Sequence, residues 1–174
     1  GHLNFGSAGT GTIPHMATEL FAGSARVDIV HVPYKGIAPA VTATVAGEVP
    51  VLFASTPAAG AMVKAKRLRA LAVTTAKRSA FMPELPTVAE AGVPGYDVAT
   101  WWGVLAPGKT PAAIVNRLND EIRKILATDE VRARIVADGA EPVLDMSAEK
   151  FTALLKTDIA KWRRIVKERN IKTE

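Results

Sequence analysis

The chain has 174 residues, of which 48% are hydrophobic, 22% are charged and 6% are aromatic, and its formal net charge is +5. This apolar content excludes a disordered protein, and the absence of cysteine excludes a disulfide scaffold, a thiol nucleophile and a cysteine zinc site. No apolar run is long enough to cross a bilayer, and the positive charge favours anionic partners only through its long-range field.

The first hundred residues predict alternating strands and helices. A strand that ends at Phe5 leads through a glycine-rich turn into a helix that starts near Thr12, has Pro14 in its first turn and ends at Gly23. The pattern then predicts a strand at 29–32, a helix at 38–46, a strand at 49–53, a helix at 57–66, a strand at 68–74 and a short helix at 87–92. This alternation is typical of parallel α/β units.

The character of the chain changes near residue 97. A strand is predicted at 100–106, and its neighbours Trp101 and Trp102 would point to opposite faces. A strongly amphipathic helix follows from Thr110, then a helix at 130–138, a short strand at 142–144 and a long helix at 148–169. We therefore expect two lobes, an α/β lobe over residues 1–97 and a helix-dominated region over residues 98–174.

The turn after the first strand is the most informative segment for function. Residues 6–12 read Gly-Ser-Ala-Gly-Thr-Gly-Thr, and a helix is predicted to follow directly. A strand, a glycine-rich turn and a helix N-terminus present unpaired amides in a partly positive field, which suits a carboxylate or a phosphate. The spacing matches neither the dinucleotide fingerprint, the phosphate loop nor the nucleophile elbow. A tight turn without a ligand therefore stays open as an alternative.

Two further loops carry polar residues where a predicted strand gives way to a helix. Tyr34 and Lys35 follow the second strand, and Ser55 and Thr56 follow the third. The carboxyl ends of parallel strands meet at one edge of a sheet, which is where ligands bind in open α/β folds. We expect the three loops to converge there, although each one taken alone also fits an exposed turn.

Neither the histidines nor the basic residues indicate a separate function. His2, His15 and His31 show no metal-ligand spacing, and ordinary hydrogen-bonded roles are expected for them. The basic residues of the last helix are interspersed with Asp158 and Glu168, which argues against a nucleic-acid surface.

The motifs together resemble a known family, the Bug proteins, which are substrate-binding proteins of tripartite tricarboxylate transporters. The resemblance rests on the glycine-rich turn with the His-Met-Ala-Thr-Glu-Leu-Phe run at 15–21, and on Val-His-Val-Pro-Tyr-Lys-Gly at 30–36. It continues through Leu-Arg-Ala-Leu-Ala-Val-Thr at 68–74, Leu-Pro-Thr-Val-Ala-Glu-Ala-Gly at 85–92 and Trp-Gly-Val-Leu-Ala-Pro at 102–107. The resemblance covers essentially the whole chain in order.

The resemblance implies an α/β periplasmic-binding-protein type II fold, present in part. It implies most of the second lobe plus the C-terminal part of the first, so the chain is expected to begin partway into the second lobe of a longer protein. It also implies an exported, periplasmic bacterial protein that captures a small carboxylate for membrane permease subunits, without chemistry, cofactor or metal. A dimer of the fragment and weak ligand binding by the fragment alone are further expectations.

Carried onto this sequence, the resemblance implies a ligand site built largely from backbone amides of loops that face the other lobe. The positions that match are Ser7, Ala8, Gly9, Thr10, Gly11 and Thr12, with Tyr34, Lys35, Gly36, Ser55 and Thr56 as weaker candidates. Many relatives carry an acidic residue after the third strand, where this chain has Phe-Ala-Ser-Thr at 53–56. The difference favours a plain carboxylic acid over a ligand with an amino group.

Two other functions stay open on the residues alone. One is a nucleotide- or phosphate-using α/β enzyme, for which His15 and Lys35 are the available candidates. The other is a solute sensor for a membrane signalling kinase, which begins with the same capture of ligand.

Overall fold

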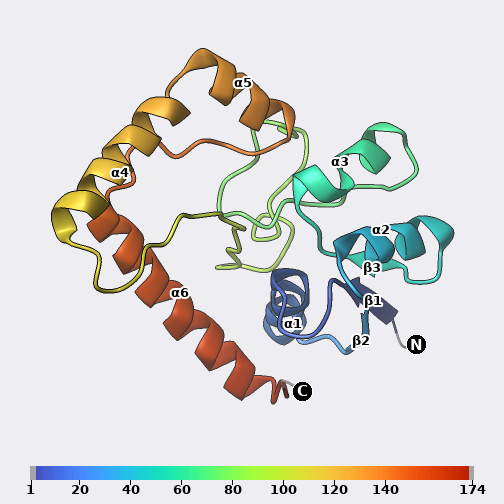
Figure 1. Cartoon of the computed structure of the whole chain (residues 1–174). Coiled ribbons are helices and arrows are strands. Elements are labelled where there is room, and N and C mark those ends of the chain that lie inside the picture. The colour runs from blue at the N-terminus through green and yellow to red at the C-terminus, as the bar shows by residue number, and fades with distance from the viewer. Residues whose placement is uncertain (1–2, 173–174) are drawn as a thin grey trace. The chain divides into compact units, whose positions relative to one another are not determined.

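A computed structural model describes residues 3–172. In chain order the elements are β1 (Leu3–Ser7), α1 (Ile13–Ala25), β2 (Ile29–Pro33), α2 (Ile37–Ala46), β3 (Val51–Leu52), α3 (Thr56–Lys64), α4 (Ala112–Leu126), α5 (Asp129–Ala137) and α6 (Ala148–Glu168) (Figure 1). Two compact units are distinguished: unit 1 holds the described residues up to Thr100 and those from Arg164 onward, and unit 2 is Trp101–Arg163. None of the described helices is long and apolar enough to span a membrane.

Unit 1 is built on three parallel strands in the order β2-β1-β3. The central strand β1 places Phe5 opposite His31 on one side and opposite Val51 on the other. Both α1 and α2 pack against β1, whose last three residues are buried (Figure 1). The carboxyl ends of the three strands therefore share one edge, and the parallel α/β architecture predicted for this half is confirmed.

Helix α1 runs two residues beyond its predicted end. Gly23 stays helical, and Arg26 takes the left-handed conformation that ends the helix, with φ 54° and its amide directed at the carbonyls of Ala22 and Gly23. The glycine has a packing reason instead, because a Cβ at position 23 would lie 3.5 Å from Cδ of Arg169. A helix-ending role for Gly23 was therefore wrong.

The hydrophobic core of unit 1 joins these elements to the segment that follows them. Tyr96 is almost fully buried, and its hydroxyl donates a 2.9 Å hydrogen bond to the carbonyl oxygen of Ala17 in α1. Burial raises the pKa of the Tyr96 phenol, which keeps it a neutral donor. Ile165, from the last turns of α6, is also buried within unit 1.

Two predicted elements of unit 1 are not formed. The strand expected at 68–74 is reduced to one bridge, between Val73 and Thr87. The capping box at 87–90 does form, since the Thr87 amide donates to Glu90 Oε2 at 2.8 Å and the Glu90 amide donates to Thr87 Oγ1 at 3.0 Å. The segment nevertheless remains a turn rather than a helix, because Gly92 leaves the helical conformation at φ 118° and the Val93 amide bonds back to the Val88 carbonyl instead of that of Ala89.

Unit 2 consists of α4, α5, most of α6 and irregular connections. The strands predicted at 100–106 and 142–144 are absent, because no described strand pairs with either segment. Trp101 instead donates to Asp158 Oδ2 at 2.7 Å and packs edge-on against Phe151, whereas Trp102 is 69% exposed. The predicted helices are confirmed, but no residue of α4 is buried.

The tryptophans, tyrosines and histidines are not evenly distributed between the two units. The three tryptophans, Trp101, Trp102 and Trp162, belong to unit 2, whereas both tyrosines, Tyr34 and Tyr96, belong to unit 1. The histidines of the described chain, His15 and His31, also belong to unit 1.

Candidate functional site

The turn between β1 and α1 is held by its own side chains. Gly9 and Gly11 have φ values of 120° and 77°, which a side chain would strain. The Gly9 amide donates to Ser7 Oγ at 3.0 Å, and the Thr12 hydroxyl donates to the Gly9 carbonyl at 2.6 Å. The turn is thus fixed before any ligand arrives, as recognition by backbone amides requires.

Several amides of this turn nevertheless remain available. Among the described residues, no acceptor is assigned to the amides of Ala8, Thr10, Ile13 or His15. Helix α1 has 13 residues and carries no acidic side chain in its first turn, so nothing of its own neutralises the positive end of its dipole. The turn therefore offers several donors and a favourable field to one anion.

Two histidines lie directly behind the turn as a stacked pair. The rings of His15 and His31 have centroids 3.9 Å apart and planes 17° apart, and the Phe5 ring lies 4.9 Å from that of His31 and 6.2 Å from that of His15. The Gly11 amide donates to His15 Nδ1 at 3.1 Å, and Ser7 Oγ lies 2.6 Å from His31 Nε2. Both ends of the turn are therefore tied to an imidazole.

Burial keeps both imidazoles neutral near pH 7. Desolvation lowers the pKa of His15, although the nearby Glu19 carboxylate opposes that effect. Desolvation and the charge of His15 together lower the pKa of His31 to about 4. Because Nδ1 of His15 accepts the Gly11 amide, the proton of the neutral ring is on Nε2.

A carboxylate and a guanidinium complete this arrangement. Glu19 lies one helical turn after His15, with Oε1 3.9 Å from His15 Nε2. Its other oxygen, Oε2, accepts a hydrogen bond from Arg169 Nε at 2.9 Å. The two partners are 150 residues apart in sequence, so the end of unit 1's chain helps to fix the helix that carries His15.

The Ser7–His31 pair resembles a nucleophile with its base but does not have the access that catalysis needs. The exposed fraction of Ser7 is 0%, and its hydroxyl already serves the Gly9 amide. Since the His31 ring lies against the rings of both His15 and Phe5, the contact is explained by support of the turn. Ser7 accordingly helps to hold the shape of the turn, and its hydroxyl points into the protein.

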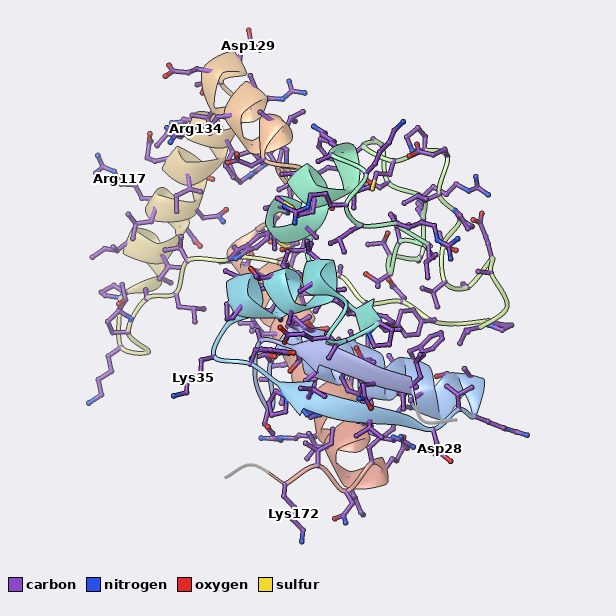
Figure 2. All side chains as sticks on the ribbon, turned by 90° about the vertical axis from the view of Figure 1, so that its right-hand side faces the viewer. Asp28, Lys35, Arg117, Asp129, Arg134 and Lys172 are labelled. Atoms are coloured by element: carbon purple, nitrogen blue, oxygen red, sulfur yellow. The ribbon has the colours of Figure 1, made fainter. Side chains whose placement is uncertain are left out.

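The second predicted loop lies beside the first. The Tyr34 amide donates to the Ser7 carbonyl at 3.0 Å, and a Cβ at Gly9 would lie 3.4 Å from the Tyr34 carbonyl oxygen. Gly36 precedes α2 with φ 115°. Lys35 is exposed and projects away from the sheet (Figure 2). The structure therefore brings Tyr34 to the turn and leaves the Lys35 ammonium in solvent.

The third predicted loop begins α3 on the other side of β1. Ser55 is the residue before the helix, and its carbonyl accepts the amides of Ala58 and Ala59. Neither Ser55 nor Thr56 is fully buried, and neither is assigned a side-chain hydrogen bond. Because β3 neighbours β1, this loop lies at the same sheet edge as the other two.

A surface groove of about 500 Å³ lies elsewhere in unit 1. Its lining comes from the end of α3 and from the segment around Leu85, and it includes Lys66, Arg67 and Arg69. The loop with Ser55 and Thr56 is at the opposite end of α3, so the groove and the three loops are separate features.

Sequence reasoning missed the histidine pair. Ordinary hydrogen-bonded roles were expected for His15 and His31, and both histidines do make hydrogen bonds, but their stacking on each other was not predicted. The missed signal was the parallel register, in which Phe5 pairs with His31 while the helix after β1 returns across the same strands. A histidine in the first turn of that helix then faces a histidine in the neighbouring strand.

A comparison with protein families matches residues 1–171 to the family described as "Tripartite tricarboxylate transporter family receptor". The chain is 41% identical over 169 residues to a Pseudomonas sp. (strain P51) protein, the "UPF0065 protein in tcbD-tcbE intergenic region", and the match covers 97% of this chain and 50% of that relative. It is 33% identical to a Pseudomonas knackmussii protein, the "UPF0065 protein in clcB-clcD intergenic region", with coverages of 95% and 98%. The chain thus spans about half the length of the first relative and nearly all of the second.

Solved structures agree with this match. The R. palustris protein Rpa4515, solved with adipate, superposes with a TM-score of 0.87 at 38% identity, over 97% of this chain and 56% of that one. The periplasmic binding protein BugD gives 0.85 at 27% identity, over 99% and 58%. MatC from Rhodopseudomonas palustris, with bound malate, gives 0.81 at 29% identity, over 94% and 56%. The expected fold, part of a periplasmic binding protein, is confirmed.

Proposed function

We propose, from the premise that this chain belongs to the tripartite tricarboxylate transporter receptor family, that it captures a small carboxylate at the β1–α1 turn. The observation that carries the proposal is that the amides of Ala8, Thr10 and Ile13 have no hydrogen-bond acceptor among the described residues. They lie at the start of a helix whose first turn has no acidic side chain. Adipate and malate, named with the related structures, are carboxylates of the class that such a turn suits.

The residues of the neighbouring loops favour a carboxylic acid that carries no amino group. The residues around Ser55 and Thr56 contain no carboxylate, and the Lys35 ammonium is turned outward. A ligand ammonium would therefore lack an anionic partner at this sheet edge, whereas hydroxyl and carboxylate oxygens would find donors. Tyr34, Gly36, Ser55 and Thr56 are proposed to border the ligand rather than to hold its charge.

The proposed role is delivery without chemistry. The family description supports a receptor that works with membrane permease subunits, and BugD's description as a periplasmic binding protein supports the same compartment for this chain. The inward-facing, fully covered hydroxyl of Ser7 supports binding rather than catalysis. Residues up to about 97 are proposed to form the ligand-facing lobe, and residues from about 98 to belong to the other lobe.

Calorimetric titration with adipate and malate, at ligand concentrations high enough for the weak binding expected of this chain alone, tests this function. The Gly11→Val chain is expected to lose binding, because a side chain at Gly11 meets no protein atom within 4 Å and would occupy the space in front of the amides. The control is Gly47→Val, which has a similar φ of 83° and equally open space but follows α2, at the opposite edge of the sheet. Equal binding by both variants would contradict the proposed site.

A smaller effect is expected at Thr10, whose side chain is exposed. Thr10→Ala should weaken binding by about 1 kcal/mol if the hydroxyl donates to the ligand, as one neutral hydrogen bond would. An amino-substituted dicarboxylate should bind less tightly than its plain counterpart, and tighter binding of the amino acid would contradict the choice of ligand class.

Self-association of this chain is proposed through unit 2. Val104 and Leu105 are more than 70% exposed, and Ile114, Leu118 and Ile125 on α4 are about half exposed. Exposed apolar groups at this density favour burial against a second copy. Sedimentation equilibrium should therefore show a dimer that Leu105→Glu weakens, whereas a monomer at all concentrations would contradict it.

A further inference from the structure

We infer that His15 is a positioning residue that holds the glycine-rich turn in its binding geometry only while the imidazole is neutral, so that acidification releases the turn and lowers carboxylate affinity. The clause about affinity rests on the proposed function, whereas release of the turn is a property of the ligand-free chain.

The geometry makes His15 the link between the turn and the helix. His15 is 4% exposed, in the first turn of α1, and its Nδ1 accepts the amide of Gly11 at 3.1 Å. Gly11 directly precedes Thr12, the residue before helix α1, and follows Thr10, whose amide is proposed to face the ligand. The hydrogen bond therefore fixes the peptide plane between Thr10 and Gly11, next to the Thr10 amide that is proposed to face the anion.

Protonation removes this bond for a chemical reason. The neutral ring has one nitrogen with a proton and one acceptor, whereas the imidazolium has N–H groups at both nitrogens. A protonated Nδ1 would point its hydrogen at the Gly11 N–H, so two donors would face each other at 3.1 Å. The ring or the turn must then move.

The groups around His15 offer a proton little support. On its own helix, Glu19 is 3.9 Å from Nε2, but that carboxylate is already shared with Arg169, which approaches from the chain after α6. From β1 and β2, the Phe5 and His31 rings face the imidazole, and neither is anionic. A charged His15 would thus be stabilised only by a partly neutralised carboxylate.

His31 adds a second, more acidic step to the response. Its ring is stacked on His15 at 3.9 Å, so a positive charge on one ring opposes a charge on the other, and the pair takes up protons in coupled steps. His31 also contacts Ser7 Oγ, which accepts the Gly9 amide at the other end of the turn. Acidification therefore acts on both ends of the same short segment.

Two amide variants of the 174-residue chain separate this role from general packing. His15→Asn places a carbonyl oxygen near the position of Nδ1, so it can accept the Gly11 amide but cannot be protonated. His15→Gln is similarly polar, but its carbonyl lies near the position of Nε2, where it cannot reach Gly11. The Gly11 amide resonance in ligand-free protein and calorimetric affinity for adipate are then measured from about pH 7.5 to about pH 4, because burial lowers the pKa of His15 below the ordinary value of histidine.

In the wild type, the Gly11 resonance is expected to move with the titration of His15, and affinity should fall by about fivefold relative to His15→Asn, the equivalent of one hydrogen bond. Because adipate itself gains protons in this range, the ratio of the two proteins at each pH is the relevant quantity. His15→Gln should be weak at every pH and should bind as the acidified wild type does.

A constant affinity ratio between the wild type and His15→Asn, with an unmoved Gly11 resonance, would overturn the inference while leaving carboxylate binding intact. A Gly11 resonance that follows His15 in a chain that binds neither adipate nor malate would instead overturn the proposed function. In that case acid would still release the turn, but the predicted loss of carboxylate affinity would no longer apply.

Discussion

The β1–α1 region of unit 1 and the helical unit 2 show two outcomes of similarly clear sequence patterns. Around the turn, the amides and rings of a few residues are bonded within one buried cluster, and Phe5, Ser7 and His15 are almost fully covered. In unit 2 the helices form as their patterns predict, yet α4 has no buried residue. Local pattern is thus enough to define a helix, whereas a preorganised site needs a sheet to pack against.

Truncation of one apolar side chain in each region should give the largest contrast. Phe5→Ala should cost about 3–5 kcal/mol of unfolding free energy, because Phe5 is 0% exposed and supports the stacked histidines. Leu105→Ala should cost less than about 0.5 kcal/mol, because Leu105 is 73% exposed. Urea unfolding followed by circular dichroism measures both, and similar costs would remove the contrast.

A glycine pair tests the backbone of the two regions. Gly9→Ala should cost about 1–3 kcal/mol, because φ is 120° and the added Cβ would lie 3.4 Å from the Tyr34 carbonyl oxygen. Gly108→Ala in unit 2 should be neutral, since the added atom meets nothing within 4 Å and no positive φ is involved. The same unfolding assay applies, and a neutral Gly9→Ala would show that the turn is not held as described.

Acid should weaken unit 1 selectively. The pKa of His31 is lowered in the folded chain to about 4, so the native state favours the neutral ring and the unfolded state takes up the proton first. The contribution of His31 to the free energy of unfolding is therefore fully present above about pH 6.5. It is lost as the pH drops toward 4, and the loss is about 1–2 kcal/mol after allowance for partial exposure of the ring.

His31→Gln keeps a polar group near Ser7 and cannot titrate there, so it should flatten this part of the pH dependence of unfolding. Unit 2 contains no histidine, so its stability should change less over the same range, through exposed carboxylates such as Glu149 alone. An unchanged slope in His31→Gln would show that protonation of His31 does not cause the loss of stability in acid.

The smallest contrast concerns single hydrogen bonds. Tyr96→Phe should cost about 1 kcal/mol, because it removes the buried bond to the Ala17 carbonyl. Trp101→Phe should cost less, because the bond that it removes, to Asp158, is exposed to water. Thermal unfolding of the two variants beside the wild type measures the difference, and a larger loss for Trp101→Phe would reverse the ranking.

Elements with local signals were predictable from the sequence. The proline-started α1, the glycine-ended α2 and the amphipathic α4 all have their cause within a few neighbouring residues. The strands expected at 68–74, 100–106 and 142–144 failed, because a strand exists only where another strand supplies its hydrogen bonds, and no local signal specifies that partner. The capping box shows the limit most clearly, since both of its bonds form without a helix.

The candidate site was likewise predictable only where its features have a local cause in the sequence. The donor-rich turn and the shared sheet edge follow from strand–turn–helix order, and both are present. The support behind the turn was not predictable, because His15, His31 and Arg169 meet only through the parallel register and through the return of the chain after α6. Ligand binding by the residues of the turn stays a prediction, which calorimetric titration with adipate and malate tests.

The separation of tryptophan from tyrosine gives the two units different intrinsic fluorescence. Light absorbed only by indole reports on unit 2, through Trp101, Trp102 and Trp162, whereas phenol emission comes from Tyr34 and Tyr96 in unit 1. The melting of each unit can therefore be followed in the unlabelled protein, and a change that disturbs the glycine-rich turn would register in the phenol signal before the indole signal moved.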